Sequence, residues 1–316
     1  MLIRRLARTI LPLRLKLELL RLMRLPVWLV ERHLLSPVRA EAGERPRFSA
    51  VLSVSSSPLM RDIPNYGGRL QAGKERNVTL AASLLDGVIV PANRVFSYYH
   101  TLGRPTRLRG FRRGLELHAG RSSKGIGGGC CQVANMLYLL ALEGGMKIVE
   151  RHRHGLDLFP DRDRAVPFGC GATVFYNYMD LRFENPLPQP VMLKMWVQEG
   201  ALHGELRALE APEWRAEVYE VGHRFFRKNG DWFRENRIRR RFLLPDGAVL
   251  LDREEAHNIG RVLYEPHECG GGEPDEHGAR TRPDQADGAK DRAGATGRRE
   301  SKRPSGQEGE RCDAPC

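Results

Sequence analysis

The sequence predicts an α+β fold in which a cysteine-bearing helix packs on a mainly antiparallel sheet, with a basic N-terminal helix and a disordered C-terminal tail. Two observations carry this prediction. A helix-like apolar run begins at the Gly-Gly-Gly-Cys-Cys segment 127–131, and several strand-like runs with short links follow it. A helix followed by closely linked strands is typical of this class, because short links favour antiparallel pairing.

Composition divides the 316 residues into four segments. Residues 1–46 form a basic amphipathic leader and linker, 47–210 a globular domain, 211–268 a β-rich extension and 269–316 a tail. The tail is rich in Gly, Pro and charged residues and has almost no apolar ones. Such a segment cannot bury enough apolar surface to offset the entropy cost of ordering, so we expect it to be disordered.

Leucines and arginines are interspersed throughout the leader. The arginines interrupt every apolar stretch, so neither a secretory signal peptide nor a membrane-spanning helix is evident. We therefore expect a cytoplasmic protein. Residues 1–30 instead predict an amphipathic helix, for which two placements are open. It lies on an anionic membrane surface, which puts the protein peripherally at the cytoplasmic membrane face, or it packs on the protein's own core.

A net charge of +12 favours an anionic partner, which can be nucleic acid, acidic lipid or an acidic cell-wall polymer. The basic residues at 101–124 form either an anion-binding flap or a solvated loop or hairpin. Basic and aromatic residues also alternate at 224–241. There we prefer a hairpin that turns at 229–231 over a surface for single-stranded nucleic acid, so nucleic acid is not an expected partner.

Apolar periodicity predicts the elements of the globular domain. Ahead of the cysteines we expect a strand at 48–54, a helix at 77–86 that is N-capped by Asn77, and strands at 87–91 and 94–99. From the cysteines onward we expect a helix at 131–142 and strands at 146–154, 172–183, 190–197 and 202–206.

The segment Gly127–Cys131 is the strongest candidate for a functional site. Glycines allow positive φ and close approach of another group, and the following helix start presents unpaired N–H groups and a partial positive charge to Cys131. A thiol in that setting is readily deprotonated and becomes a nucleophile. The alternative is a tight turn whose small residues let a core helix pack, with two buried cysteines.

A cysteine nucleophile needs a base, and the base needs an orienting group. His152 and His154 share one face of the strand predicted after the helix, and Asp180 and Asp157 are candidate orienters. Asp161 and Asp163 are weaker choices because they fall in a predicted loop. The N–H groups of Gly129, Cys130 and Cys131 are candidates for an oxyanion hole. We assign substrate binding to Gly127, Gly128, Gly129, Cys130 and Gln132.

Together these parts describe acyl transfer or amide hydrolysis through a thioester. A zinc site made of His152, His154 and Cys131 is the competing interpretation. Its ligand spacing does not match the usual zinc motifs, so we expect neither a metal nor another cofactor.

Several motifs in residues 77–197 resemble the VanW family. They are the segments 77–87 and 91–97, the Gly-Gly-Gly-Cys-Cys-Gln-Val run at 127–133, the stretch 148–154, Ala-Thr-Val at 172–174 and Asp-Leu-Arg-Phe at 180–183. The resemblance assigns the cysteine role to Cys131 and the histidine role to His154. The family pattern has aspartate where this chain has Gly171, which leaves Asp180 as the remaining acid.

The family takes its name from an accessory protein of vancomycin-resistance gene clusters, which implies a link to peptidoglycan or its precursors. Two functions are therefore expected. The first is a cysteine-dependent peptidase, amidase or transpeptidase-like enzyme that acts on a cell-envelope peptide or precursor. The second is a non-catalytic module that recognises an anionic envelope ligand.

Overall fold

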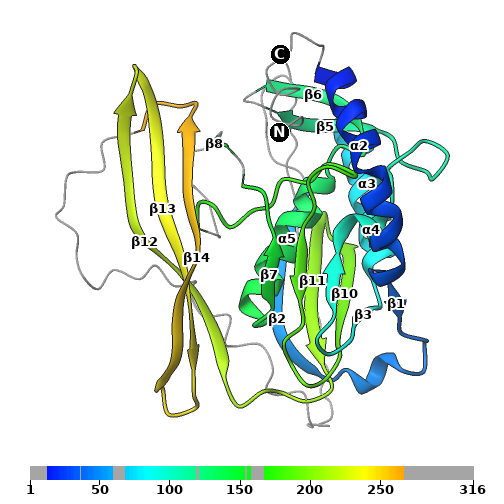
Figure 1. Cartoon of the computed structure of the whole chain (residues 1–316), viewed down its shortest axis with the longest axis vertical. Coiled ribbons are helices and arrows are strands. Elements are labelled where there is room, and N and C mark those ends of the chain that lie inside the picture. Colours follow the sequence, from blue (N-terminus) through cyan, green and yellow to red (C-terminus); the bar gives the residue numbers. More distant parts are fainter. Residues whose placement is uncertain are drawn as a thin grey trace, which may run out of the picture. The chain divides into compact units, whose positions relative to one another are not determined.

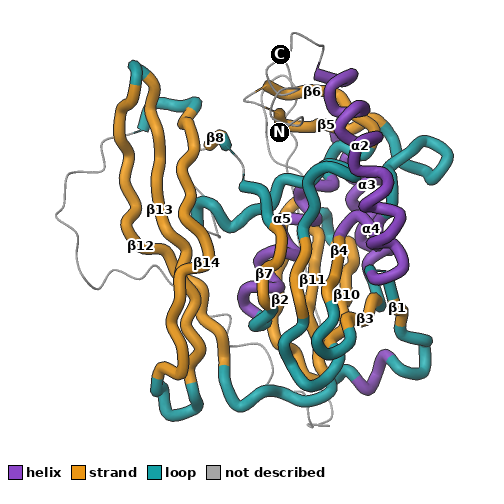
Figure 2. The backbone as a smooth tube through the Cα atoms, in the orientation of Figure 1, coloured by secondary structure: helices purple, strands orange, loops and turns teal. Residues whose placement is uncertain are grey.

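The structure is a computed structural model, and it describes residues 13–35, 37–59, 68–118, 121–153, 155–157 and 167–266. These residues contain four α-helices and fourteen strands (Figures 1 and 2). All the strand pairs are antiparallel except that between β8 and β14. The predicted α+β class with a mainly antiparallel sheet is therefore confirmed.

The central element is a five-stranded antiparallel sheet in the order β1-β3-β10-β11-β2. Its hairpin of β10 and β11 turns at Glu199 and Gly200, which both have positive φ. The predicted strands at 48–54, 87–91, 190–197 and 202–206 all belong to this sheet. The bounds are β1 Val38–Arg39, β2 Ala50–Pro58, β3 Val88–Val90, β10 Val191–Gln198 and β11 Ala201–Ala208.

Helices α3 (Gly68–Leu85) and α5 (Cys130–Glu143) pack on the inner face of this sheet. Ten of the 14 residues of α5 are buried, as expected for a helix that is apolar nearly all round. Gly204 of β11 lets α5 approach closely, because a Cβ at this position would lie 2.9 Å from side-chain atoms of Leu140 and Met136. The predicted packing of a cysteine-bearing helix on the sheet is thus confirmed.

The predicted start of α3 is wrong. The helix begins at Gly68, so Asn77 lies in its interior and not at its N-cap. Asparagine is unfavourable inside helices because its side chain competes for backbone hydrogen bonds. Here the fully buried side chain of Asn77 instead bonds to backbone outside its own helix.

Shorter elements surround this core. The predicted strand at 94–99 ends early, because Ser97 caps the short helix α4. The basic stretch 101–124 contains a hairpin. The bounds are β4 Val95–Ser97, α4 Tyr98–Leu102, β5 Arg113–His118, β6 Arg121–Ile126, β7 Lys147–Glu150 and β9 Arg182–Glu184. Strands β4, β9 and β7 form a three-stranded antiparallel sheet.

Two strand predictions near the site are too long. The strand expected at 146–154 ends at Glu150, so His152 follows it in a segment without regular structure, and His154 lies outside the described residues. The strand expected at 172–183 is reduced to β9. Residues 172–181 run without regular structure apart from a turn closed by the Phe175–Met179 bridge. Side-chain hydrogen bonds replace the missing ladder there, as described below.

Strands β12 (Arg215–Lys228), β13 (Asp231–Leu243) and β14 (Val249–Val262) form a second antiparallel sheet, which the short β8 (Leu156–Asp157) joins in parallel. The predicted hairpin is confirmed, with positive φ at Asn229 and Gly230. The buried Arg240 connects β13 to the end of α5, because its guanidinium donates to the carbonyls of Leu142 and Met146.

The leader contains helix α2 (Leu13–Leu34), in dark blue next to α4 in Figure 1. It contacts the domain mainly through polar groups. Among the described helices, none has the length and apolarity needed to cross a bilayer. Residues 1–12 of the leader and the predicted disordered tail at 269–316 lie outside the described residues.

Candidate functional site

The glycine turn, residues 127–129, connects β6 to α5 and is tightly packed. Gly127 and Gly129 have φ of 89° and 104°, which L side chains rarely adopt. A Cβ on Gly127 would lie 2.7 Å from Pro105, and one on Gly129 would lie 2.9 Å from Lys74 of α3. Both the backbone conformation and the space therefore require glycine at these two positions.

Asn77 fixes this turn to the rest of the domain. Its Nδ2 donates to the carbonyls of Gly128 and Arg112, both at 2.9 Å, and its Oδ1 accepts from the N–H of Arg112 at 2.7 Å. The Gly127 N–H also donates to the Arg112 carbonyl at 3.1 Å. One buried amide thus satisfies backbone groups of two segments just beyond the β5–β6 ladder, whose last pair is Arg113 and Ile126.

Three amide donors in and next to the turn form local backbone hydrogen bonds. Gly128 donates to Gly125, Cys130 donates to Gly127, and Gln132 donates to Gly129, at 3.3, 3.0 and 2.9 Å. The N–H group of Cys130, one of the three expected to form an oxyanion hole, is therefore satisfied locally. The side-chain amide of Gln132 donates to Ser57 Oγ and Pro58 O, so it holds the end of β2.

The two cysteines at the start of α5 have different environments. Cys130 is 4% exposed, and its carbonyl accepts a hydrogen bond from the Tyr98 hydroxyl at 3.0 Å. Cys131 is half-buried, and its Sγ lies 3.9 Å from the Val174 carbonyl oxygen. Burial raises the pKa of the Tyr98 and Tyr99 hydroxyls well above the usual value, with the neighbouring thiols adding to the shift. Both tyrosines are therefore neutral at physiological pH.

Residues 172–174 lie between α5 and the segment that carries His152. On one side the Ala172 N–H donates to Asn135 Oδ1 of α5 at 2.8 Å. On the other side the Thr173 N–H donates to the His152 carbonyl at 2.8 Å. Residues 172–174 thus separate the segment that carries His152 from helix α5, which carries Cys131.

The imidazole of His152 interacts with a carboxylate, with Nε2 2.9 Å from Glu150 Oε1. Because His154 lies outside the described residues, its distance from Cys131 stays open. Of the alternative acids, Asp157 belongs to the second sheet, where it binds Arg234 at 3.2 Å and the Tyr264 hydroxyl at 2.9 Å. Asp161 and Asp163 also lie outside the described residues.

Asp180 is a buried acceptor just ahead of β9. Its carboxylate accepts hydrogen bonds from Ser97 Oγ at 2.5 Å, Tyr99 N at 3.0 Å, Leu181 N at 2.9 Å and Arg182 Nε at 3.1 Å. Burial raises the pKa of the Asp180 carboxyl, and the hydrogen bond from Ser97 opposes that shift. These donors hold Asp180 to α4 and β9, so its carboxylate anchors the irregular segment 172–181.

Arg182 joins this anchor to the leader helix. Its guanidinium lies 3.3 Å from Glu150 Oε2 and makes two bonds to Glu31 of α2, at 2.9 and 2.7 Å. Burial alone would lower the pKa of Arg182, but the hydrogen bond to Glu31 and the charge of Asp180 raise it above its usual value. Sequence reasoning missed this cluster, because four of its members lie in separate elements.

The described residues contain no group of three or more His, Cys, Asp or Glu side chains that could hold a metal ion. The competing zinc site includes His154, which lies outside the described residues.

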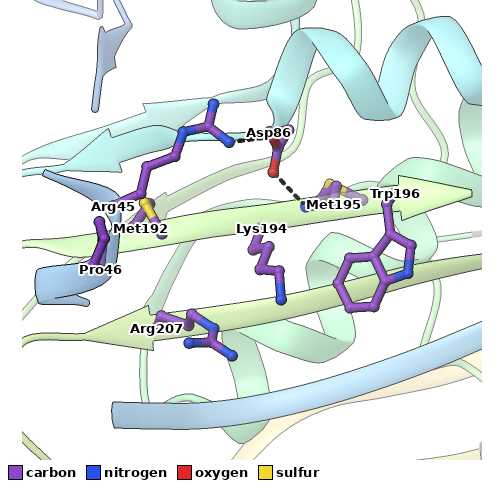
Figure 3. Close-up of a pocket in the computed structure, with 8 residues that line it drawn as sticks. All are labelled: Arg45, Pro46, Asp86, Met192, Lys194, Met195, Trp196 and Arg207. Atoms are coloured by element: carbon purple, nitrogen blue, oxygen red, sulfur yellow. Dashed lines mark hydrogen bonds and ion pairs between the residues drawn. The ribbon is translucent and has the colours of Figure 1, made fainter. Parts of the chain in front are cut away.

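A second candidate site lies on the outer face of the five-stranded sheet. It is a hollow of about 340 Å³, and Figure 3 shows Lys194 at its centre. Arg45 and Pro46 come from the short helix η1 (Arg45–Arg47), and Asp86 follows α3. The remaining lining residues come from β10 and β11: Met192, Lys194, Met195, Trp196 and Arg207.

Cations outnumber carboxylates in and around this hollow. Arg45 pairs with Asp86 at 2.6 Å, while Lys194 and Arg207 both pair with Glu205, the former at 3.5 Å. Three cations thus share two carboxylates. The sequence signal for this site is the alternation along β10, which places Met192, Lys194 and Trp196 on one face.

Trp196 forms one end of the hollow. The Lys194 ammonium lies 4.7 Å from the centroid of its ring, and His203 of β11 stacks on the ring at 5.2 Å with an interplanar angle of 12°. The Trp196 ring beside the cations of the hollow suits a ligand that has both a negatively charged group and a less polar part.

Comparison with known proteins bears directly on the region that holds both candidate sites. Residues 73–207 match the family model described as VanW like protein. We call residues 73–207 the VanW-like domain. Of the residues described above, this domain includes the glycine turn, Cys131, Asp180 and the strands that form the hollow, whereas Arg45 and α2 precede it.

Two curated relatives each match part of the chain. The uncharacterized protein YoaR of Bacillus subtilis is 30% identical over 149 residues, which cover 46% of each chain. The vancomycin B-type resistance protein VanW of Enterococcus faecalis is 22% identical over 182 residues, which cover 58% of this chain and 66% of that protein. The matches thus span between about half and two thirds of the relatives' own lengths. No solved structure matches significantly.

The ion pair between Glu31 and Arg182 predicts a pH-dependent contribution to stability. Arg182 lowers the pKa of Glu31 in the folded protein. Stabilisation by Glu31 is therefore complete above its unfolded pKa of about 4.5 and is lost as the pH falls through the lower folded value. At pH 7 we expect Glu31→Gln to reduce the free energy of unfolding by about 1 kcal/mol.

Denaturant unfolding of the wild type and the variant between pH 3 and 7 measures this effect. The difference between them should shrink as the pH falls below 4.5 and through the lower pKa of Glu31 in the folded protein. Glu75→Gln, at an exposed position on α3, is the matched control and should change little at any pH. A Glu31→Gln effect that is the same at pH 3 and pH 7 would contradict the ion-pair account.

Proposed function

We propose that the VanW-like domain is a binding module for an anionic cell-envelope ligand, which it holds in the hollow on the outer face of the sheet. The observation that carries this proposal is the surplus of cations over carboxylates around a concave site of a size that suits small ligands. Exposed ion pairs such as Lys194 with Glu205 contribute little to stability, so an incoming anion can replace them at small cost.

The chemistry of the hollow favours a ligand that carries phosphate or carboxylate. Arg45 and Arg207 offer planar guanidinium groups that bind such anions with two parallel hydrogen bonds, and Lys194 adds a point charge between them. Peptidoglycan precursors carry both kinds of anion. The relative from E. faecalis is named as a vancomycin resistance protein, and resistance to that antibiotic is a property of the cell envelope. We extend this link to the present chain.

The packing of the glycine turn also supports a binding function over catalysis at that turn. Its glycines at 127 and 129 are required by close contacts with Pro105 and Lys74, and the Cys130 N–H donates to the Gly127 carbonyl. Asp180 is engaged by Ser97, Tyr99 and Arg182. The glycine run is thus explained by structure without a catalytic demand.

Titration with a soluble nucleotide-linked muramyl pentapeptide tests the binding function. We expect Lys194→Ala to weaken binding about tenfold, or roughly 1.4 kcal/mol, because it removes the most central cation of the hollow. The effect should be strongest at low ionic strength, where charge interactions are least screened. Isothermal titration calorimetry gives the dissociation constants.

Lys147→Ala is the matched control, because Lys147 is an equally ion-paired, exposed lysine that lies 2.9 Å from Glu184 on another sheet. It should leave the dissociation constant within about twofold. The muramyl pentapeptide without its nucleotide and the nucleotide alone show which anion is recognised. Absence of wild-type binding to all three, or equal losses in both variants, would overturn the proposal.

A second candidate function, a cysteine-dependent acyl-transfer or amide-hydrolysing enzyme, is favoured by the position of Cys131. It is the second residue of α5, where the helix dipole stabilises a thiolate, and it is half-buried while Cys130 and Cys170 are buried. In that enzyme Cys131 is the nucleophile and His154 its base. The thiolate attacks an amide carbonyl, and the C–N bond breaks as protonated His154 gives its proton to the leaving amine, which leaves a thioester. Water or another amine then attacks the thioester, takes the acyl group and releases the thiolate.

Iodoacetamide labelling at pH 7 with peptide mapping tests this candidate. An activated Cys131 should react at least tenfold faster than Cys130 in the same protein, and the rate should fall as the pH drops through the pKa of the thiol. His154→Ala should slow the labelling, because it removes the base. A Cys131 that reacts no faster than a free model thiol would eliminate the enzyme.

A further inference from the structure

Helix α2 packs on the domain with its polar side. Arg21 and Arg24 donate to the carbonyls of Tyr176 and Tyr178 at 2.9 and 2.6 Å. Asn177 donates back to the Arg21 carbonyl at 2.8 Å. The side of this helix that meets the protein thus carries both arginines besides the buried Leu20, whereas an amphipathic helix on a globular core usually turns its apolar side inward.

Further contacts fix the C-terminal half of α2 in the same orientation. Glu31 makes its two bonds to Arg182, and the Trp28 ring stacks on His100 of α4 at 5.3 Å. Because these contacts come from successive turns, the rotation of the helix about its own axis is determined.

The opposite side of α2 is apolar and exposed. Leu22, Val30 and Leu34 are 63%, 68% and 63% exposed, and they continue a stripe that recurs at helical spacing. The other large apolar side chains exposed along the helix are Leu15, Leu19, Met23, Leu25, Val27 and Leu29. Soluble domains rarely expose so continuous an apolar surface unless it is an interaction site.

We propose that this exposed side of α2 inserts into the surface of an anionic lipid bilayer and holds the domain there. Charge supports this occupant. Residues 1–34 contain eight Lys and Arg residues but only two Glu, a net charge of +6, which is half of the net charge of the whole chain. A basic segment is attracted to anionic headgroups, and its apolar side chains then enter the boundary of the acyl chains.

Shape and length agree with a bilayer surface. A helix of 22 residues is about 33 Å long and lies in the plane of the membrane, with its apolar side down and the domain above. The exposed side of α2 is a convex ridge. A fluid bilayer adapts to such a ridge, whereas a protein partner would need a groove of matching shape.

Co-sedimentation with vesicles tests this inference. The full chain should bind vesicles that contain 30 mol% phosphatidylglycerol and bind pure phosphatidylcholine vesicles at least tenfold more weakly. Leu22→Glu with Val30→Glu should reduce binding to the anionic vesicles at least tenfold, because two charges would enter the apolar region. Leu250→Glu on β14, which is 60% exposed in the wild type, is the matched control and should bind as the wild type does.

Light scattering of the lipid-free protein separates the membrane from a second copy of the chain. If the wild type is a dimer that the double variant dissociates, and it does not bind vesicles, the apolar side is a protein interface and the inference is wrong. Equal vesicle binding by the wild type and the double variant would also overturn it. Lys194→Ala should bind vesicles normally, so failure of the ligand-binding function is distinguishable from failure of this one.

Discussion

The buried amide of Asn77 is the interaction on which the rest of the domain depends. It joins the interior of α3 to the glycine turn and to the backbone at Arg112, which both lie at the end of the β5–β6 ladder. Because the turn passes so close to α3 at Gly129 and to Pro105 at Gly127, side chains are excluded at both positions. The start of α5 is thereby fixed, and the sheet packs against the rest of that helix.

This constraint separates two parts of the domain that serve different purposes. The inner side of the sheet packs against α3 and α5, and its apolar residues form one buried cluster with theirs. The outer side carries Lys194, Trp196 and Arg207 around an open hollow. The glycine turn and α5, which carry the most distinctive sequence motif, therefore contribute stability. Ligand binding is assigned to β10 and β11, whose sequences differ from those of ordinary strands only in their charges.

The local elements could be predicted from the sequence because their signals are local. Apolar and polar residues alternate along β10 and β11, and Asn229–Gly230 is a turn sequence. Each of these signals spans only a few residues, which is enough to predict a strand or a hairpin. The helix of Cys131 was evident from its apolar run. The α3 start was missed because Asn77 resembles a cap, and only contacts with distant backbone explain an asparagine inside a helix.

The site was less predictable, because its partners come together only through tertiary structure. The segment 172–181 has the composition of a strand, yet Asn135, Ser97 and Arg182 hold it in an irregular path. Asp180 therefore serves as an anchor in the described structure. Periodicity also predicted that α2 has an apolar and a charged side, but it could not tell which side faces the protein.

Amide hydrogen exchange at the glycine turn tests the central claim most directly. If the turn is a packed joint held by Asn77, the N–H groups of Gly127, Cys130 and Arg112 should exchange only on global unfolding, as slowly as those in the middle of α5. Exchange of these three amides at the rates of exposed loops, in a protein whose α5 amides stay protected, would show an open turn and contradict the account.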